Sequence, residues 1–443
     1  MNAGKKQRQG LLERLQTDGR LISALAPVSA LLLSVSMLLM GNGLQGTLVP
    51  VRGNLESFLP FELGLLGAAY FIGFTLGCLH GPLLVRRAGH IRTYLAMTSV
   101  ASAVAVLHPV FIDAIVWSVQ RAVTGYCFAV LYIVIESWLN ERADNEMRGT
   151  VFSVYTIINL TVITAGQMML GLADPTSFAL FALSSVLVSV AALPVAFTVA
   201  VSPAAVEFVR PHLGKLYRIS PVGVAGCLAV GLANGSFWAL GPVFAQNLGL
   251  NTAGIGFFMS AVVLGGAISQ WPLGRLSDRM DRRIVIIIAG LVALAAAIAL
   301  MLIPENDRMS MIIAGAVFGA GAFPIYPLSV AHANDYADRS EFVAVSSGLL
   351  LVFGIGAAAG PLLASVVREV ALVPTLFFFT AAVHAALIVY VVWRMTQRSA
   401  PADEERIEFA DAAIAAQTVT PFDPLADDIV TEETSAGTPE QPS

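Results

Sequence analysis

Residues 42–51 (NGLQGTLVPV) and residues 234–243 (NGSFWALGPV) share one pattern, in which Asn-Gly is followed by six residues and then by Pro-Val. Both stretches lie inside long apolar runs, one in each half of the chain. A second correspondence at nearly the same spacing pairs Gly125 with Gly319 and Tyr132 with Tyr326. Self-similarity over such a distance indicates a repeated structural unit, so we expect two halves with the same internal order of elements.

The composition is that of a membrane protein. Of the 443 residues, 56% are hydrophobic and 12% are charged, whereas a soluble domain carries about 25% charged residues. A membrane-spanning helix needs about 20 mostly apolar residues. Twelve segments meet this condition: 22–48, 63–85, 93–111, 114–137, 150–173, 176–198, 220–245, 252–273, 283–303, 310–333, 343–366 and 371–394. The sequence therefore predicts an all-α membrane protein whose twelve transmembrane helices form two pseudo-symmetric six-helix bundles.

The basic residues predict the orientation. Loops on the cytoplasmic side of a membrane are enriched in Lys and Arg, and here the loops on the side of the two termini hold most of them. The opposite loops contain only Arg52, Arg308 and Arg368. We therefore expect both termini to be cytoplasmic. The expected divisions are a cytoplasmic N-terminal segment (1–20), a first bundle (21–199), a cytoplasmic linker (200–219), a second bundle (220–397) and a disordered, solvated acidic tail (398–443). The alternative for part of that tail is a short amphipathic piece around residues 407–414.

Two motifs resemble those of a known transporter family. The loop GRLSDRMDRR (274–283) resembles the signature loop of the major facilitator superfamily, and RAVTG (121–125) resembles its Arg-x-x-x-Gly motif. The stretches ESWLNERADNEMRG and PIYPLSVAHANDYADR are similar to a bacterial branch with poorly defined substrates. The resemblance, over about residues 20–397, implies secondary transport by alternating access in the bacterial inner membrane. It also implies that spans 1, 4, 7 and 10 line a central cavity and that spans 2, 5, 8 and 11 form the interface between bundles.

The chain departs from the family pattern in three places. Arg86 stands where the first-half loop usually has Asp, and Asp281 stands where the second-half loop usually has Gly. The fifth span reads ITAGQMMLG and lacks the Gly-Pro-rich motif of drug/proton antiporters. We expect Asp278 to form an inner latch, and the predicted gating residues are Arg86, Arg87, Glu136, Asp278, Arg279, Arg282 and Arg283. Glu136 falls at the cytoplasmic end of its span, where a salt bridge to loop arginines is more plausible than proton transport.

Arg121 is the strongest indication of a ligand site. It lies about seven residues inside a span, and an arginine within the membrane is costly unless it faces protein or water. A guanidinium group matches the geometry of a carboxylate, so Arg121 is predicted to contact an anionic or polyhydroxy substrate. The alternative is an internal hydrogen-bond network.

Polar and aromatic residues elsewhere in the cavity spans complete the predicted substrate site: Asn42, Gln45, Tyr70, Tyr132, Tyr155, Asn159, Asn234, Trp238 and Tyr326. The glycines and prolines beside Asn42 and Asn234 predict points where the two helices bend. Both asparagines can equally serve as hydrogen bonds between helices. The prolines of FPIYP (323–327) predict a further bend in the tenth span.

These patterns favour a secondary transporter of a small polar or anionic organic solute. The alternatives are an efflux transporter for drugs or amphipathic metabolites, and a membrane sensor that binds without transport. No nucleotide loop, metal cluster or catalytic triad is visible in the sequence, so we expect no enzyme activity and no cofactor. Coupling to a proton gradient stays open, because no Asp or Glu falls in mid-membrane. The expected partners are the substrate and the lipid bilayer, without nucleic acid, and the expected state is a monomer.

Overall fold

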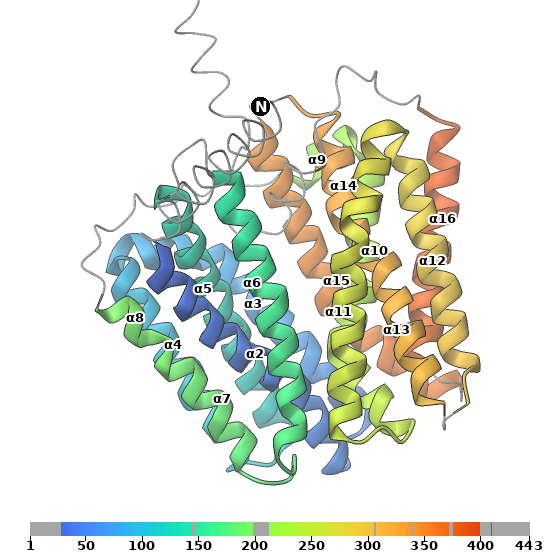
Figure 1. Cartoon of the computed structure of the whole chain (residues 1–443). Helices are drawn as coiled ribbons and strands as arrows, with labels where there is room; N and C mark the ends of the chain where they lie inside the picture. Colours follow the sequence, from blue (N-terminus) through green and yellow to red (C-terminus); the bar gives the residue numbers. More distant parts are fainter. Residues whose placement is uncertain are drawn as a thin grey trace, which may run out of the picture.

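A computed structural model describes the helical body of the protein. The described residues are 28–142, 148–197, 212–304, 307–338, 341–371, 375–398 and Phe409. Twelve helices in this part of the chain are long and apolar enough to cross a membrane, and they form two groups placed side by side (Figure 1). The predicted all-α fold of twelve transmembrane helices is confirmed.

The first bundle contains spans one to six. Its helices are α2 (Ser29–Leu55), α3 (Pro60–Ala88), α4 (His90–Leu107), α5 (Ala114–Arg142), α6 (Arg148–Met168), α7 (Ala179–Val190) and α8 (Ala192–Ala196), and the 3₁₀ turn η3 (Met169–Leu172) follows α6. Spans five and six each consist of two consecutive elements, α6 with η3 and α7 with α8.

The second bundle contains spans seven to twelve. Its helices are α10 (Pro221–Asn247), α11 (Thr252–Arg279), α12 (Arg282–Leu302), α13 (Arg308–Ala322), α14 (Ile325–Asn334), α15 (Phe342–Ala371) and α16 (Thr375–Met395). A short helix, α9 (Leu213–Ile219), precedes α10 in the segment predicted as a linker. Span ten breaks between α13 and α14 at Phe323 and Pro324, which confirms the bend predicted there.

Two sequence-based expectations for span one need correction. The described helix runs from Ser29 to Leu55, so its end lies several residues later than predicted, whereas the predicted start at residue 22 lies outside the described residues. It also continues without a break past Asn42 and Pro50, as α10 does past Asn234 and Pro242. Proline is tolerated inside membrane helices because neighbouring groups satisfy the freed backbone. The predicted hinges are therefore absent from α2 and α10 in this conformation.

The glycines of the two Asn-Gly pairs allow close helix packing. A Cβ placed on Gly43 would lie 2.5 Å from the carbonyl oxygen of Ile163 on α6, and one on Gly235 would lie 2.5 Å from that of Ala357 on α15. Small residues at such crossings let two helix backbones approach each other. These glycines thus fix α2 on α6 and α10 on α15.

The packing inside the two bundles repeats. A Cβ on Gly125 of α5 would overlap the carbonyl oxygen of Tyr70 on α3, and a Cβ on Gly319 of α13 would overlap that of Val262 on α11. Tyr70 and Val262 stand in corresponding places of the two halves, as the two glycines do. The sequence repeat therefore corresponds to the same helix crossing in each half.

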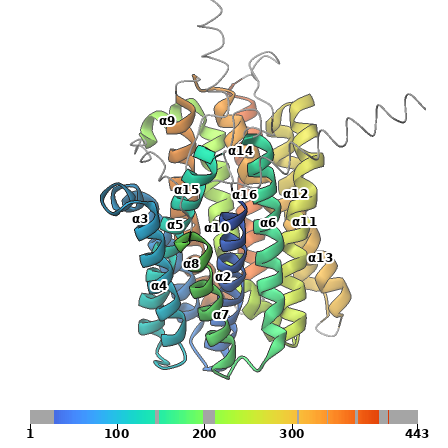
Figure 2. The same cartoon turned by 60° about the vertical axis from the view of Figure 1, so that its left-hand side comes forward.

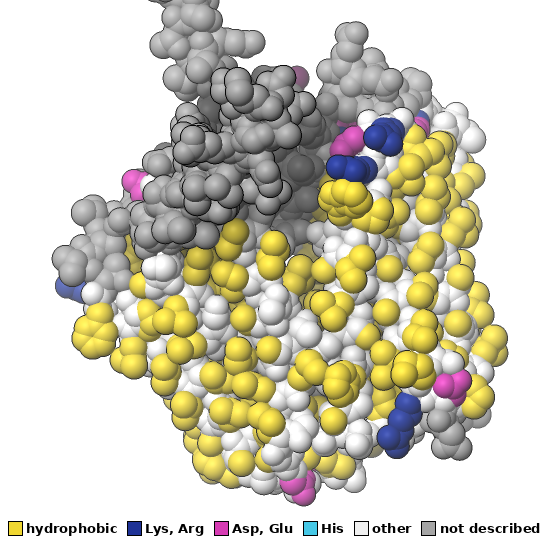
Figure 3. Space-filling model, viewed as in Figure 1, with side chains coloured by type: hydrophobic (Ala, Val, Ile, Leu, Met, Phe, Trp, Pro, Cys, Tyr) yellow, Lys and Arg dark blue, Asp and Glu magenta, His cyan; other side chains and the backbone are white. Residues whose placement is uncertain are grey.

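The molecule has two distinct ends. We call the end at which α2 begins and α16 ends the tail end, and the opposite one the far end; the tail end is uppermost in Figures 1 and 2. Between them, the face seen in Figure 3 is covered mainly by apolar side chains, and charged side chains gather near the two ends. This distribution is that of a surface embedded in a bilayer.

The two bundles meet through α3 against α15 and α6 against α11. At the far end, a Cβ on Gly64 of α3 would lie 2.7 Å from the carbonyl oxygen of Pro361 on α15. Nearby, Gly67 of α3 is so close to Ala239 of α10 that a Cβ there would overlap it. The bundles are thus tightly closed at the far end.

The acidic tail departs from its expected solvated state at one described position. Phe409 is 6% exposed and belongs to an apolar cluster of the second bundle. Leu273 and Leu276 of α11 pack against the same cluster. The rest of the predicted tail beyond Arg398 lies outside the described residues.

Candidate functional site

A cavity of about 440 Å³ lies between the bundles. It extends from Pro50 in the far half of α2 to Val343 in the first turn of α15, at the tail end. Residues of α2, α3, α5, α6, α10 and α15 line it. Its volume falls in the usual range for small-molecule sites, about 300–1,000 Å³.

Arg121 is the charged side chain of this cavity. It lies on α5, about 11 Å along the helix axis from Ala114 at the far end, and only 7% of the residue is exposed. Its guanidinium carbon stands 4.4 Å from the centre of the Tyr70 ring, in a cation–π contact. Its Nη1 is buried and has no hydrogen-bond partner. Among the described residues, no carboxylate forms an ion pair with Arg121.

The lining contains no carboxylate, so the positive charge of Arg121 is not neutralised within it. A buried charge without a partner is strongly unfavourable. The cavity therefore supplies a cationic donor whose natural complement is an anion from solution.

Three amide side chains, one of them fully buried, also line the cavity. Asn42 of α2 lies beside the hydroxyl of Tyr70. Asn159 and Gln167 line the cavity from α6, and a buried side-chain oxygen of each has no partner. Gln167 is 1% exposed. Amide groups left without partners in a low-dielectric interior are costly, so a polar ligand would stabilise them.

An aromatic wall completes the site. The cavity is lined by Tyr70, Phe71, Phe74, Tyr132, Trp238 and Phe353. The Trp238 ring is stacked on Phe323, with ring centres 5.9 Å apart, which holds Trp238 in place. The polar groups thus occupy one part of a mostly apolar chamber.

Six of the ten residues predicted to bind substrate line this cavity: Asn42, Tyr70, Arg121, Tyr132, Asn159 and Trp238. The other four lie outside its lining. Gln45 is buried in α2, and Tyr155 is buried in the apolar cluster of the first bundle. Asn234 is buried on α10, although its counterpart Asn42 faces the cavity. Tyr326 lies behind Phe353, with ring centres 5.0 Å apart.

The assignment of spans to the cavity also needs correction. The resemblance implied that spans 1, 4, 7 and 10 line it. In the structure α3, α6 and α15, which are spans 2, 5 and 11, contribute to the lining, whereas span ten contributes no residue. The reason is that the cavity lies between the bundles, where the interface helices α3, α6 and α15 face it.

Gln167 and Cys78 are among the lining residues that sequence reasoning missed. Gln167 stands two turns from Asn159 in an otherwise apolar span, and this spacing could have indicated it. Cys78, which from its apolar surroundings could equally be a packing residue, lines the cavity from α3. A cysteine in an apolar run gives no signal that separates these two roles.

A polar clasp closes the far end of the site. The Nδ2 of Asn54, at the end of α2, donates to Oε1 of Gln246 at 2.9 Å and to Oδ1 of Asn247 at 3.0 Å, both at the end of α10. Asn54 and Gln246 are equivalent positions of the two halves, 192 residues apart. Sequence reasoning missed this pair, although the repeat offset alone connects them.

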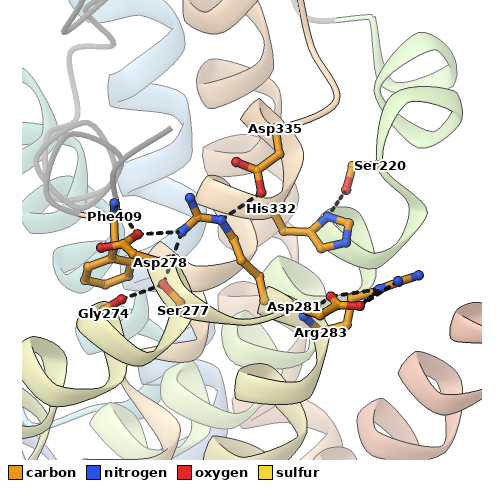
Figure 4. Close-up of polar contacts among 10 residues, drawn as sticks. Ser220, Gly274, Ser277, Asp278, Asp281, Arg283, His332, Asp335 and Phe409 are labelled. Carbon is orange, nitrogen blue, oxygen red and sulfur yellow. Dashed lines mark hydrogen bonds and ion pairs between the residues drawn. The ribbon is translucent and has the colours of Figure 1, made fainter. Parts of the chain in front are cut away.

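The predicted inner latch residues form a network at the tail end of the second bundle (Figure 4). Arg282 Nε donates to Asp335 Oδ2 at 2.7 Å, and both side chains are almost fully buried. Asp278 Oδ1 lies 3.5 Å from Arg282 and accepts a hydrogen bond from the backbone N of Phe409 at 2.9 Å. All the bonds drawn in Figure 4 thus join residues of the second half of the chain to one another.

Asp281 forms a second pair in this region. Its carboxylate binds Arg283, with an N–O distance of 2.6 Å, and accepts from the Arg283 backbone N–H at the start of α12. Burial raises the pKa of Asp281, but these hydrogen bonds and the charge of Arg283 outweigh it, so that the pKa lies below its ordinary value.

The remaining predicted gating residues differ in how far their side chains are exposed. Arg86, Arg87 and Arg279 are exposed at the tail end, whereas Glu136 is 1% exposed within the first bundle. Their gating roles stay predictions. Within the described ranges, no three His, Cys, Asp or Glu side chains lie together as metal ligands would.

Comparisons with known proteins agree with this architecture. The sequence profile of the Major Facilitator Superfamily matches residues 222–424. An uncharacterized MFS-type transporter of Enterobacter sp. (strain 638) is 27% identical over 337 residues, which cover 76% of this chain and 87% of the relative. The corresponding protein YcaD of Escherichia coli (strain K12 / DH10B) is 26% identical over the same shares. The family profile thus matches the second half of the chain, and the relatives that align with three quarters of it are MFS-type transporters.

Solved structures of transporters have the same fold. The nucleoside transporter NupG superposes with a TM-score of 0.71 at 11% identity, over 84% of this chain and 98% of NupG. A bacterial homologue of the lysosomal transporter Spinster, inward-facing and occupied, gives 0.65 at 16% identity, over 86% and 98% of the two chains. The resemblance inferred from the loop and Arg-x-x-x-Gly motifs is therefore confirmed, and the fold is that of secondary transporters.

Proposed function

We propose that this transporter moves a small organic anion through the cavity by alternating access. The observation that carries this proposal is the state of Arg121, which is the charged residue of the lining, is buried, and has an Nη1 without a partner. A hydrogen bond to a charged group is worth about 1.5–3 kcal/mol. A carboxylate would also satisfy the planar guanidinium in a two-point contact.

The shape of the lining supports an organic rather than an inorganic anion. Most of the lining residues are aromatic or aliphatic, and Tyr132 and Trp238 offer aromatic rings to the same chamber as Arg121. A carboxylate bearing a flat apolar body fits both parts of this chamber. The amides of Asn159 and Gln167 are placed to bind hydroxyl or amino substituents on that body.

The tail end is proposed to face the cytoplasm. It carries the exposed Arg86, Arg87, Arg275 and Arg279, whereas the cations of the far end are few, as expected for the cytoplasmic side. With this orientation the cavity is open toward the cytoplasm and closed toward the outside, and the clasp of Asn54 belongs to the outer gate. Location in the bacterial inner membrane, with both termini inside, follows from the same orientation.

Coupling to protons is proposed to involve the substrate. No lining residue is a carboxylate, and Glu136 is buried away from the cavity lining. A weak acid that enters protonated would carry its own proton past Arg121. The monomeric state stays a prediction.

The test compares metabolites inside and outside cells that express the intact protein, Arg121→Gln, or the matched control Arg275→Gln. Arg275 is exposed on α11 and stacks on Trp271, 3.9 Å from the ring centre, outside the cavity. We expect organic acids to be redistributed by the intact protein and by Arg275→Gln, and not by Arg121→Gln. Redistribution of the same acids by Arg121→Gln at equal expression would remove Arg121 from the binding site.

Efflux of amphipathic compounds is a second candidate, favoured by the aromatic wall of Phe71, Phe74 and Phe353. It predicts that cells expressing the protein gain resistance to neutral or cationic apolar drugs, and that Arg121→Gln retains that resistance. Resistance profiles of the two strains therefore separate efflux of drugs from transport of anions.

A further inference from the structure

Phe409 of the acidic tail is seated on α11 at the tail end of the second bundle (Figure 4). Its backbone N donates to Asp278 Oδ1 at 2.9 Å. Its ring occupies the space above Gly274, where a Cβ would overlap the ring carbons. The residue is 6% exposed. We call Gly274 and Asp278 the seat of Phe409. Asp278 provides the hydrogen-bond acceptor, and Gly274 leaves open the space for the ring, which any other residue would fill.

The seat lies on the face of α11 that meets the other bundle. Gly256 and Ser260 mark that face at the far end: a Cβ on Gly256 would lie 2.7 Å from the carbonyl oxygen of Gln167 on α6, and Ser260 Oγ donates to the carbonyl of Thr164 at 3.4 Å. Gly274 and Asp278 follow these two residues by eighteen positions each. At 3.6 residues per turn, eighteen residues complete five turns, so both pairs point in the same direction.

Phe409 lies where the two bundles would meet if the tail end closed. In the structure α11 touches α6 in its far half, whereas Phe409 covers the same face about 27 Å further along. Alternating access requires the tail ends of the two bundles to approach each other. The inner part of this face can meet α6 only after Phe409 has left it.

The first bundle has no corresponding seat. The positions equivalent to Gly274 and Asp278 are Pro82 and Arg86. Proline fills the space that glycine leaves, and arginine has no acceptor for a backbone N–H. The seat is therefore a property of the second half alone and not a by-product of the repeat.

We propose that Phe409 is a wedge that holds the tail end of the transporter open. Docked on Gly274 and Asp278, it stabilises the conformation in which the cavity is accessible from the tail end; undocked, it permits closure. The proposal rests on alternating access but not on the identity of the substrate.

The test measures the distance between the bundles at the tail end without added substrate. Spin labels are placed at Ser153 on α6 and at Gln397 beyond α16, two exposed positions away from the seat, in full-length protein whose three cysteines are replaced. Pulsed electron resonance then gives the populations of open and closed tail ends. We expect Phe409→Ala to raise the closed-to-open ratio about tenfold, the order expected from releasing one buried aromatic side chain.

Two further variants isolate the seat. Phe422→Ala, at the other phenylalanine of the tail, is the matched control and should leave the distances unchanged. Gly274→Ala should reproduce the effect of Phe409→Ala because its methyl group excludes the ring, and the double variant should add nothing, since both changes remove one contact. Unchanged distances in Phe409→Ala, a shift toward the open state, or an equal shift in Phe422→Ala would each overturn the wedge. None of these results bears on Arg121, because no ligand is present.

Discussion

The clasp between Asn54 and the end of α10 makes a quantitative prediction about the outer gate. Asn54→Ala removes two hydrogen bonds, at 2.9 Å to Gln246 and at 3.0 Å to Asn247. A neutral hydrogen bond contributes about 0.5–1.5 kcal/mol net, and these groups are partly exposed. We therefore expect the substitution to weaken closure of the far end by about 1–2 kcal/mol, a factor of about 5–30 in the equilibrium.

A cysteine at Gly46 can report this change. Gly46 lines the cavity from α2, and no atom lies within 4 Å of a Cβ placed there. In intact cells and a Cys78→Ser background, a membrane-impermeant maleimide reaches this cysteine only when the far end opens. The modification rate should rise about 5–30-fold in Asn54→Ala.

Three controls separate the clasp from general loosening of the far end. Asn247→Ala removes one of the two bonds and should give a smaller increase. Asn251→Ser changes an asparagine that caps α11 at the same end, and serine retains that cap, so the rate should stay the same. In a double-mutant cycle, Asn54→Ala and Gln246→Ala should be non-additive. An unchanged rate in Asn54→Ala, or full additivity with Gln246→Ala, would refute the reasoning.

Two predictions concern the tail-end network of the second bundle. Asp335→Asn removes the carboxylate charge that lies 2.7 Å from the buried guanidinium of Arg282 and should cost about 3–5 kcal/mol, seen as a lower Tm. The paired change Arg282→Met with Asp335→Leu should recover most of the loss, and a Tm equal to wild type in Asp335→Asn would contradict this. The lowered pKa of Asp281 means that its ion pair stabilises the fold at neutral pH and loses this effect as the pH falls through that pKa. Asp281→Asn, which keeps the helix cap, should thus lower the Tm at pH 7 and have no effect once the pH lies below the lowered pKa of Asp281; a difference independent of pH would count against the ion pair.

Several residues of the candidate site could be predicted from the sequence. The predicted residues that do not line the cavity share one cause. Arg121 was identified because an arginine inside a span is costly wherever the helix lies, and Tyr70 stands against it. Asn42 and Asn234 are equivalent in sequence, yet only Asn42 lines the cavity. The difference depends on how each helix is rotated against its neighbours, and neither residue carries that information.

The sequence by itself determined the number of spans and the two halves, because insertion into the membrane depends on the local length and hydropathy of each segment. It also determined the close helix crossings at Gly125 and Gly319, because the repeat preserves small residues at equivalent positions. The tertiary structure alone decided which ends of the bundles touch. That choice brings Asn54 against Gln246 and leaves the inner face of α11 to Phe409. Both contacts join residues more than a hundred positions apart, and their geometry follows from the tilt of one bundle against the other, which no local pattern encodes.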